Sequence, residues 1–254
     1  MQMLLNKDVE LIDGEAAAYI GSMRALVVSD LHLGYEGVMA KSGLFIPKAN
    51  LSSIISALER SMKGRNVERV IIVGDIKNDF SEVGAEELNE INDLFAFLRQ
   101  RRVNIILVRG NHDNFIDSYA SHFRIVPHPE HVRIGDYLFA HGDKALAGPA
   151  MRDGVKMLML GHEHPSISIR TKVGTTEKLR CFLHGNYRGV EMLVLPAIGY
   201  FETGSDIIRG RKFMSPILDM ADAGSLHAIA VGYGSTMDFG SIAELRKSGA
   251  DDLY

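Results

Sequence analysis

The stretch Gly110-Asn111-His112-Asp113 directly follows the apolar run Ile105-Ile106-Leu107-Val108. We predict that the run is a buried strand and that the tetrapeptide lies on the loop at its end, where folds often present chemistry. Asn111 can offer an amide oxygen to a metal ion, His112 can transfer a proton, and Gly110 lets the backbone turn. A Gly-Asn turn after a strand is also an ordinary loop, so the rest of the chain must decide between the two interpretations.

Two further apolar runs precede this one, and each of them also ends in polar residues. Residues 25–29 lead into Asp30-Leu31-His32-Leu33-Gly34, and residues 69–73 lead into Gly74-Asp75. The segment from Lys48 to Met62 has apolar residues at helical spacing, and so does the segment from Leu88 to Leu98. The order strand, helix, strand, helix, strand predicts parallel strands joined by right-handed crossovers. An Asp13-Gly14 turn before them predicts a hairpin over residues 9–20.

After Phe123 the pattern changes to short strands and turns. A hairpin over residues 132–140 leads into His141-Gly142, and residues 156–160 lead into Gly161-His162-Glu163-His164-Pro165. Further strands are predicted at residues 166–170, 179–184, 190–195 and 226–231. With no Pro/Gly/Ser-rich linker, repeat or low-complexity block, we expect residues 1–254 to form one domain of two packed sheets flanked by helices. Residues 235–254, rich in Gly, Ser and charge, are the candidate for a peripheral tail.

Composition excludes several classes of protein. The 254 residues are 46% hydrophobic, as in an ordinary globular protein, and the formal net charge of -4 argues against tight nonspecific nucleic-acid binding by bulk electrostatics. The single cysteine, Cys181, cannot form an internal disulfide. We find neither a signal peptide nor an apolar run long enough to cross a membrane, and we therefore expect a cytoplasmic protein without membrane partners.

Five loops, each after a predicted buried strand, present side chains that can bind metal: Asp30 and His32; Asp75; Asn111 and His112; His141; His162 and His164. Each loop alone has a structural explanation as a turn, a helix cap or a half-buried histidine. Those explanations would have to recur independently at five strand ends. Residues two apart on an extended strand end point the same way, so both His-containing pairs can converge on one cavity. Mixed carboxylate, amide and imidazole ligands favour manganese, iron or zinc over magnesium or calcium.

In order and setting, these five blocks resemble the calcineurin-like metallophosphoesterase superfamily. The resemblance spans roughly Leu26 to Pro165. A closer similarity is to the small, mainly archaeal phosphoesterases related to the repair nuclease SbcD. The residues that carry this similarity are Asp30-Leu31-His32-Leu33-Gly34-Tyr35-Glu36, Gly74-Asp75-Ile76-Lys77, the block from Gly161 to Pro165, and Leu195-Pro196-Ala197.

The resemblance implies a four-layer α/β/β/α sandwich with two divalent ions, manganese being favoured over iron or zinc. It implies that Asp30, His32, Asp75 and His164 hold one ion and that Asp75, Asn111, His141 and His162 hold the other. Ions about 3.5 to 4 Å apart need a shared anionic ligand, and a bridging Asp75 would supply one. The implied reaction is hydrolysis of a phosphodiester by direct attack of a metal-bridging hydroxide, with His112 protonating the leaving oxygen.

One position departs from the family pattern. Many members carry Asp or His three residues after the bridging Asp, where that residue orients the catalytic histidine, whereas this chain has Asn78 there. An Asn78 side chain can hydrogen-bond to His112 but would not raise its basicity as a carboxylate does. We therefore name His112 and Asn78 as the candidate catalytic residues.

Several substrates and one different function stay open at this point. Little chain remains after Leu195 for the DNA-binding cap of SbcD-type nucleases, so nucleotide and nucleic-acid phosphodiesters are both compatible with the sequence. A phosphomonoesterase is an alternative within the enzymes. A catalytically silent scaffold or protein-binding subunit of the same fold is the alternative outside them, although no expected ligand position is missing. The physiological substrate and the oligomeric state are left open.

Overall fold

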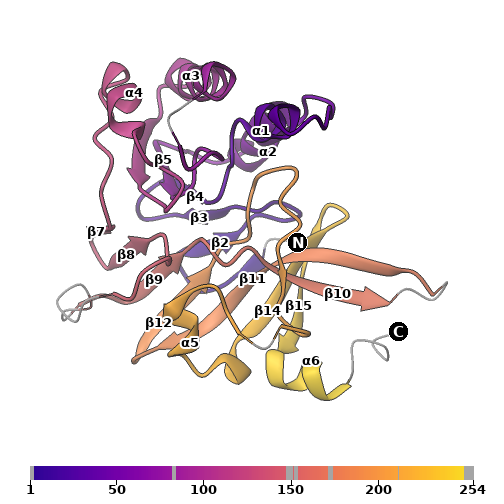
Figure 1. Cartoon of the computed structure of the whole chain (residues 1–254). Coiled ribbons are helices and arrows are strands. Elements are labelled where there is room, and N and C mark those ends of the chain that lie inside the picture. Colours follow the sequence, from indigo (N-terminus) through magenta and orange to yellow (C-terminus); the bar gives the residue numbers. More distant parts are fainter. Residues whose placement is uncertain are drawn as a thin grey trace.

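The computed structural model describes residues 3–81, 84–146, 151, 154–170, 174–210 and 212–248. Their fold is mixed α/β, with two sheets and flanking helices, as expected (Figure 1). The first sheet has six strands in sequence order, of which β4, β5 and β6 are parallel. Their bounds are β1 Met3–Leu4, β2 Val9–Leu11, β3 Ala18–Ile20, β4 Ala25–Val28, β5 Arg69–Val73 and β6 Asn104–Val108.

The second sheet has nine strands. Its main path is β13-β10-β11-β12-β9-β8-β7, and β14 pairs with both β11 and β15. Within it β8, β9 and β12 are parallel, so this sheet also contains a parallel triplet. The bounds are β7 His131–Ile134, β8 Tyr137–Ala140, β9 Met157–Leu160, β10 Pro165–Arg170, β11 Thr176–Tyr187, β12 Val190–Val194, β13 Ser205–Asp206, β14 His227–Gly232 and β15 Ser235–Ser241.

Helices cover the outer faces of both sheets. Figure 1 shows α1 to α4 over the first sheet and the short α5 and α6 beside the second. A three-residue 3-10 helix, Ala223–Ser225, lies between α5 and β14. The helix bounds are α1 Tyr35–Lys41, α2 Asn50–Met62, α3 Ala85–Gln100, α4 Ile116–His122, α5 Pro216–Asp219 and α6 Ile242–Ser248.

Three hydrophobic clusters occupy the three interfaces between these four layers. One joins the first sheet to its helices and includes Ile54 of α2 and Phe95 of α3. A second lies between the two sheets, where Val73 and Phe182 are among its members. The third joins the second sheet to α5 and α6. Because strands β4 and β5 are covered on both faces, their residues are almost continuously apolar, which is the pattern that marked them in the sequence.

The predicted strands and the two long helices are confirmed within a few residues. Helix α1 was not predicted, because its seven residues are too few to show helical periodicity. Residues 235–248, the described part of the candidate tail, form a strand and a helix. Strand β15 pairs with β14, and Ile242 and Leu245 of α6 are buried in the cluster beneath the second sheet. The remaining residues of the expected tail lie outside the described part of the chain. That the chain is a single domain stays a prediction.

Replacing Leu245 by alanine tests whether α6 belongs to the core. Leu245 is 1% exposed, so truncation removes buried apolar surface and leaves a cavity, and we expect a loss of about 2 to 4 kcal/mol in the free energy of unfolding. The matched control is Lys247→Ala on the exposed side of the same helix, which should change stability by less than about 0.5 kcal/mol. Equal effects of the two substitutions in urea unfolding would show that α6 contributes no core packing.

Candidate active site

The five loops with candidate ligands meet at one edge of the sandwich, because they follow the carboxyl ends of the parallel strands β4, β5, β6, β8 and β9. Backbone hydrogen bonds join neighbouring loops. The amide of Asp30 donates to the carbonyl of Gly74 at 3.1 Å, and the amide of Gly161 donates to the carbonyl of His141 at 2.9 Å. Backbone hydrogen bonds therefore fix the positions of these loops independently of their side chains.

Three glycines allow these loops to approach one another closely. A Cβ atom on Gly110 would collide with the carboxylate of Asp75, and one on Gly74 would collide with the ring of His141. A Cβ on Gly161 would meet Ser29 Oγ and would lie 2.9 Å from Asp30 Oδ2. In each case the clash would fall on a residue at the site, so glycine at these positions is required by the packing of the candidate ligands.

Most candidate ligands have a strained backbone. Among the described residues, eleven other than glycine have a positive φ, and five of these eleven are candidate ligands: Asp30, His32, Asp75, His162 and His164, with φ from 45° to 69°. A left-handed conformation costs an L-residue on the order of 1 kcal/mol. Such strain persists where the surrounding structure enforces it, and its concentration at these positions points to a functional site.

The first group of side chains comprises Asp30, His32 and His164, whose donor atoms lie within 4.8 Å of one another. His164 Nε2 is 3.1 Å from Asp30 Oδ1 and 3.3 Å from His32 Nε2. The other ring nitrogen of His164, Nδ1, lies 3.1 Å from Glu202 Oε2. Glu202 therefore keeps a proton on Nδ1 of His164 and leaves Nε2 facing the group, where it can bind a cation once its own proton is displaced.

The second group comprises Asp75, His141 and His162. His141 Nε2 lies 3.1 Å from Asp75 Oδ2 and 3.1 Å from Asn111 Oδ1. The opposite nitrogen of His141 donates to the carbonyl of Val73 at 3.0 Å, which orients the ring. Asp75 also lies between the groups, since His32 Nε2 is 4.0 Å from its Oδ2. All seven residues named from the sequence as candidate ligands are thus brought together.

His112 lies against both groups of side chains. The sequence predicted that it is a catalytic residue and not a metal ligand. Its Nδ1 donates to the backbone carbonyl of Asn78 at 2.6 Å, which leaves Nε2 facing Asp75 Oδ2 at 3.9 Å. The ring of Phe80 covers it with 3.7 Å between centroids. The contact with Asn78 therefore involves the main chain and not the side-chain amide. The side chain present at position 78 does not determine how His112 is held in this arrangement.

The charges at the site shift several pKa values. Burial alone would raise the pKa of Asp30, but the positive charges and hydrogen bond of its histidine neighbours, chiefly His164, outweigh burial and hold it well below its usual range. Conversely, burial would lower the pKa of His164, but Asp30 and Glu202 raise it to about 10. Burial opposes protonation of His141 too, and Asp75 nevertheless raises its pKa to about 9.

The donor set fits a pair of divalent cations. It combines imidazole, carboxylate and one amide oxygen, which is the mixture that borderline transition metals accept. The Nε2 atoms of His32 and His164 face each other at 3.3 Å beside a carboxylate, and no described residue hydrogen-bonds to the buried Nδ1 of His32. A cation between nitrogen and oxygen donors accounts for that convergence, which hydrophobic packing does not.

Two acidic residues at the site were missed as functional positions. Glu202 follows β12 by eight residues and reaches His164 only through the fold. Asp113 is buried and accepts hydrogen bonds from the amides of Gly110 and Ile76, both at 2.9 Å, so it ties the loop after β6 to the loop after β5. Burial raises the pKa of Asp113 to about 7, helped by the nearby charge of Asp75. The one indication of Asp113 in the sequence was its position in the tetrapeptide Gly110-Asn111-His112-Asp113.

Raised histidine pKa values predict a pH dependence for the metal-free protein. Protonated His141 and His164 stabilise the fold below about 6.5, the pKa expected for the unfolded chain, and this stabilisation is lost as pH rises through about 9 and about 10. We expect Tm of the chelator-treated protein to fall by roughly 5 °C or more between pH 7 and pH 10. His164→Gln should fall less over the same range. An equal decline in both proteins would exclude His164 as a source of the effect.

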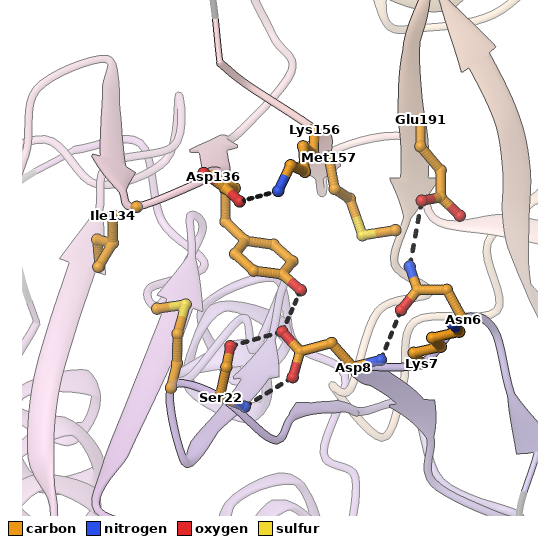
Figure 2. Close-up of a pocket in the computed structure, with 12 residues that line it drawn as sticks. Asn6, Lys7, Asp8, Ser22, Ile134, Asp136, Lys156, Met157 and Glu191 are labelled. Carbon is orange, nitrogen blue, oxygen red and sulfur yellow. Dashed lines mark hydrogen bonds and ion pairs between the residues drawn. The ribbon is translucent and has the colours of Figure 1, made fainter.

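A separate cavity of about 730 Å³ lies at the opposite edge of the sheets (Figure 2). Tyr137 and Met157, at the amino ends of β8 and β9, line it together with Asp8. The Asp8 carboxylate accepts hydrogen bonds from Tyr137 Oη at 2.5 Å and from the amide of Ser22 at 2.7 Å. None of the residues that line this cavity is a candidate ligand, so this cavity is not the candidate active site despite its volume.

Comparisons with known proteins agree with the geometry. Residues 23–145 match the family model described as calcineurin-like phosphoesterase, a range that contains every candidate ligand except His162 and His164. A comparison with curated proteins gave no match. The chain is similar in structure to a nuclease called MPE from Pseudomonas putida, with TM-score 0.64, 19% identity, and coverage of 94% of this chain and 99% of that one. It is also similar to Yfce, a phosphoesterase from E. coli, with TM-score 0.41, 16% identity, and coverage of 84% and 95%.

At 19% identity, the Pseudomonas putida structure shows that the fold is shared over nearly the whole length of both chains. In the described part of the chain, no helix has the length and apolar character needed to cross a membrane.

Proposed function

We propose that this chain is a dinuclear metal-dependent phosphodiesterase. The match to the family model and the shared fold support its assignment to the calcineurin-like metallophosphoesterase superfamily. The observation that carries the proposal is the pair of ligand groups connected through Asp75. The match to the family model and the candidate clusters support a metal-dependent hydrolase. The number of ions, the phosphodiester substrate and the role of each residue are what we propose beyond that.

The proposed ligands of one ion are Asp30, His32, Asp75 and His164, and those of the other are Asp75, Asn111, His141 and His162. Asp75 is the shared ligand, because its carboxylate contacts His141 at 3.1 Å and lies 4.0 Å from His32. Asn111 joins the second set through the 3.1 Å approach of its amide oxygen to His141. Two ligand carboxylates balance only part of the charge of two divalent ions, so an anionic phosphoester is a suitable guest.

When bound, the ions would supply Lewis acidity toward the phosphoryl oxygens and a hydroxide nucleophile near neutral pH. The protein's own residues then have separate tasks. In its doubly protonated form, His112 gives the Nε2 proton to the leaving oxygen and keeps the Nδ1 proton, which it donates to the carbonyl of Asn78. Glu202 keeps His164 in one tautomer, and Asp113 keeps the loop with Asn111 and His112 against the loop with Asp75.

We further propose manganese as the preferred ion, which the family resemblance favours among the ions that accept mixed imidazole and oxygen donors. Nucleotides or nucleic acid are the proposed substrates. The neighbour with the matching fold is a nuclease, which supports this choice.

Hydrolysis of paired synthetic esters tests the function. Metal-free protein is loaded with manganese, iron or zinc in turn, and bis(p-nitrophenyl) phosphate is compared with p-nitrophenyl phosphate. We expect about two ions per chain and faster hydrolysis of the diester. Faster hydrolysis of the monoester would favour a phosphomonoesterase. Tightly bound metal without hydrolysis of any ester, including nucleotides and oligonucleotides, would favour a scaffold.

A further inference from the structure

Exposed aromatic rings stand beside the candidate active site on loops from different parts of the chain. Phe80 is 55% exposed, Phe115 57% and Tyr200 53%. Single exposed aromatics are common on protein surfaces and need no explanation. These three differ because each lies on a loop that also carries or directly contacts a residue of the proposed site.

Phe80 and Phe115 belong to the His112 side of the site. The Phe80 ring lies over the His112 ring with 3.7 Å between centroids, and Asn114 Nδ2 donates to the Phe80 carbonyl at 3.2 Å. Phe115 caps the start of α4 with φ of 64°, which is an unusual conformation for a bulky residue. This loop keeps an apolar ring exposed through a strained backbone, which points to a function for that exposure.

Tyr200 belongs to the His164 side. Its neighbour Phe201 stacks on Tyr35 with 4.9 Å between centroids, and the next residue is Glu202, the partner of His164. The backbone of this loop is fixed firmly. Arg180 donates to the carbonyls of Gly199 at 2.7 Å and Tyr200 at 2.9 Å, which supports an exposed ring on a rigid frame.

Asn50 connects the Tyr200 loop to the proposed ligands. Its amide oxygen accepts from the amide of Tyr200 at 2.7 Å, while its nitrogen donates to the carbonyl of His32 at 2.8 Å. The rings of His112, His32 and His164 then contact one another in that order, with centroid distances of 4.9 and 5.0 Å. The rings of His112, His32 and His164 thus form a row. Phe80 contacts the His112 end of this row, and the Tyr200 loop, through Glu202, contacts the His164 end.

Basic side chains near the Phe80 and Phe115 loops are engaged elsewhere. Lys41 is paired with Asp79 at 3.3 Å, and Arg109 is paired with Asp117. Lys77 is fully buried and donates to the carbonyls of Ser81 at 3.0 Å and His112 at 3.1 Å. Lys77 is therefore withheld from a substrate, while the exposed rings of Phe80 and Phe115 are apolar surface that these loops offer beside the reacting phosphate.

We propose that Phe80 and Tyr200 are stacking platforms for unpaired bases on the two sides of the scissile phosphodiester, so that the substrate is single-stranded nucleic acid. The inference rests on the proposed phosphodiesterase function. Aromatic faces stack on any base, with about 1 to 3 kcal/mol per base lost on substitution by alanine. In a duplex, base faces are already covered by neighbouring bases, so this surface selects unpaired strands.

Binding of matched strands tests the proposal separately from hydrolysis. Two labelled six-nucleotide strands are used with the manganese-loaded protein, one bearing thymine bases and one abasic, both with phosphorothioate linkages to slow cleavage. By fluorescence anisotropy we expect the thymine strand to bind at least about 25-fold more tightly. Phe80→Ala and Tyr200→Ala should each remove about five- to tenfold of that preference while leaving the affinity for the abasic strand unchanged. Tyr200→Phe should retain the preference.

The control is Tyr233→Ala, which removes another highly exposed ring, in the turn between β14 and β15. It should not alter the preference. Equal affinity for the two strands, or equal losses on both strands in the alanine variants, would overturn the proposal. Hydrolysis of unmodified strands is measured in parallel. Hydrolysis without a base preference leaves the proposed function standing and removes this inference. A base preference without hydrolysis removes the proposed function and leaves only binding of unpaired strands by the two rings.

Discussion

Asp75→Asn is expected to lower kcat/KM for a phosphodiester by at least about 1000-fold, which corresponds to about 4 kcal/mol of transition-state stabilisation. Asp75 is 2% exposed and belongs to two of the three groups whose donor atoms lie within 4.8 Å of one another. An asparagine keeps the size of the side chain but loses the negative charge and the second oxygen donor that a shared ligand needs. We also expect the metal content to fall to one ion per chain or fewer.

The control for this substitution is Asp8→Asn at the opposite edge of the sheets. Asp8 also accepts several hydrogen bonds, but it lies in the separate cavity and contacts no candidate ligand among the described residues. Its replacement should leave metal content and activity near those of the wild type. Metal content by elemental analysis and Tm are measured with activity. A fully active, metal-replete Asp75→Asn protein would contradict the shared-ligand assignment.

His112→Gln is expected to lower kcat by about 100- to 10,000-fold for a nucleotide phosphodiester, whose leaving oxygen needs a proton. The loss should be much smaller for a p-nitrophenyl ester, because p-nitrophenolate leaves without protonation. Metal content should be unchanged, since His112 is not a proposed ligand. Equal losses with both leaving groups, or loss of bound metal, would contradict the role of His112 as a general acid. The donor atoms of His112, His32 and Asp75 lie within 4.8 Å of one another, which is also compatible with metal binding by His112. Metal content must therefore be measured together with kcat.

Asn78→Ala separates the two ways in which Asn78 can act on His112. The observed contact is made by the Asn78 carbonyl, at 2.6 Å from Nδ1, and alanine retains that carbonyl. We therefore expect kcat with the nucleotide ester to stay within about threefold of wild type, against the 100-fold or larger loss for His112→Gln. A loss as large as that of His112→Gln would show that the amide side chain acts in catalysis.

Local patterns in the sequence determined the strands, the two long helices and the loops of the candidate site. Continuous apolar runs such as residues 69–73 mark strands that are covered on both faces, and polar residues at their carboxyl ends meet wherever parallel strands share an edge. This is why Asp30, Asp75 and Asn111 could be grouped before the fold was described. Glycine beside these residues was part of the same local signal.

Only the tertiary structure decided what depends on contacts between distant segments. Glu202 reaches His164 across 38 positions, and the Tyr200 amide reaches Asn50 across 150. His112 contacts the carbonyl of Asn78 and not its side chain. Strand β15 and helix α6 complete the second sheet and its core. The physical reason is that periodicity and turn chemistry are properties of neighbouring residues. Partners across a sandwich are set by strand pairing and layer packing, which no short stretch encodes.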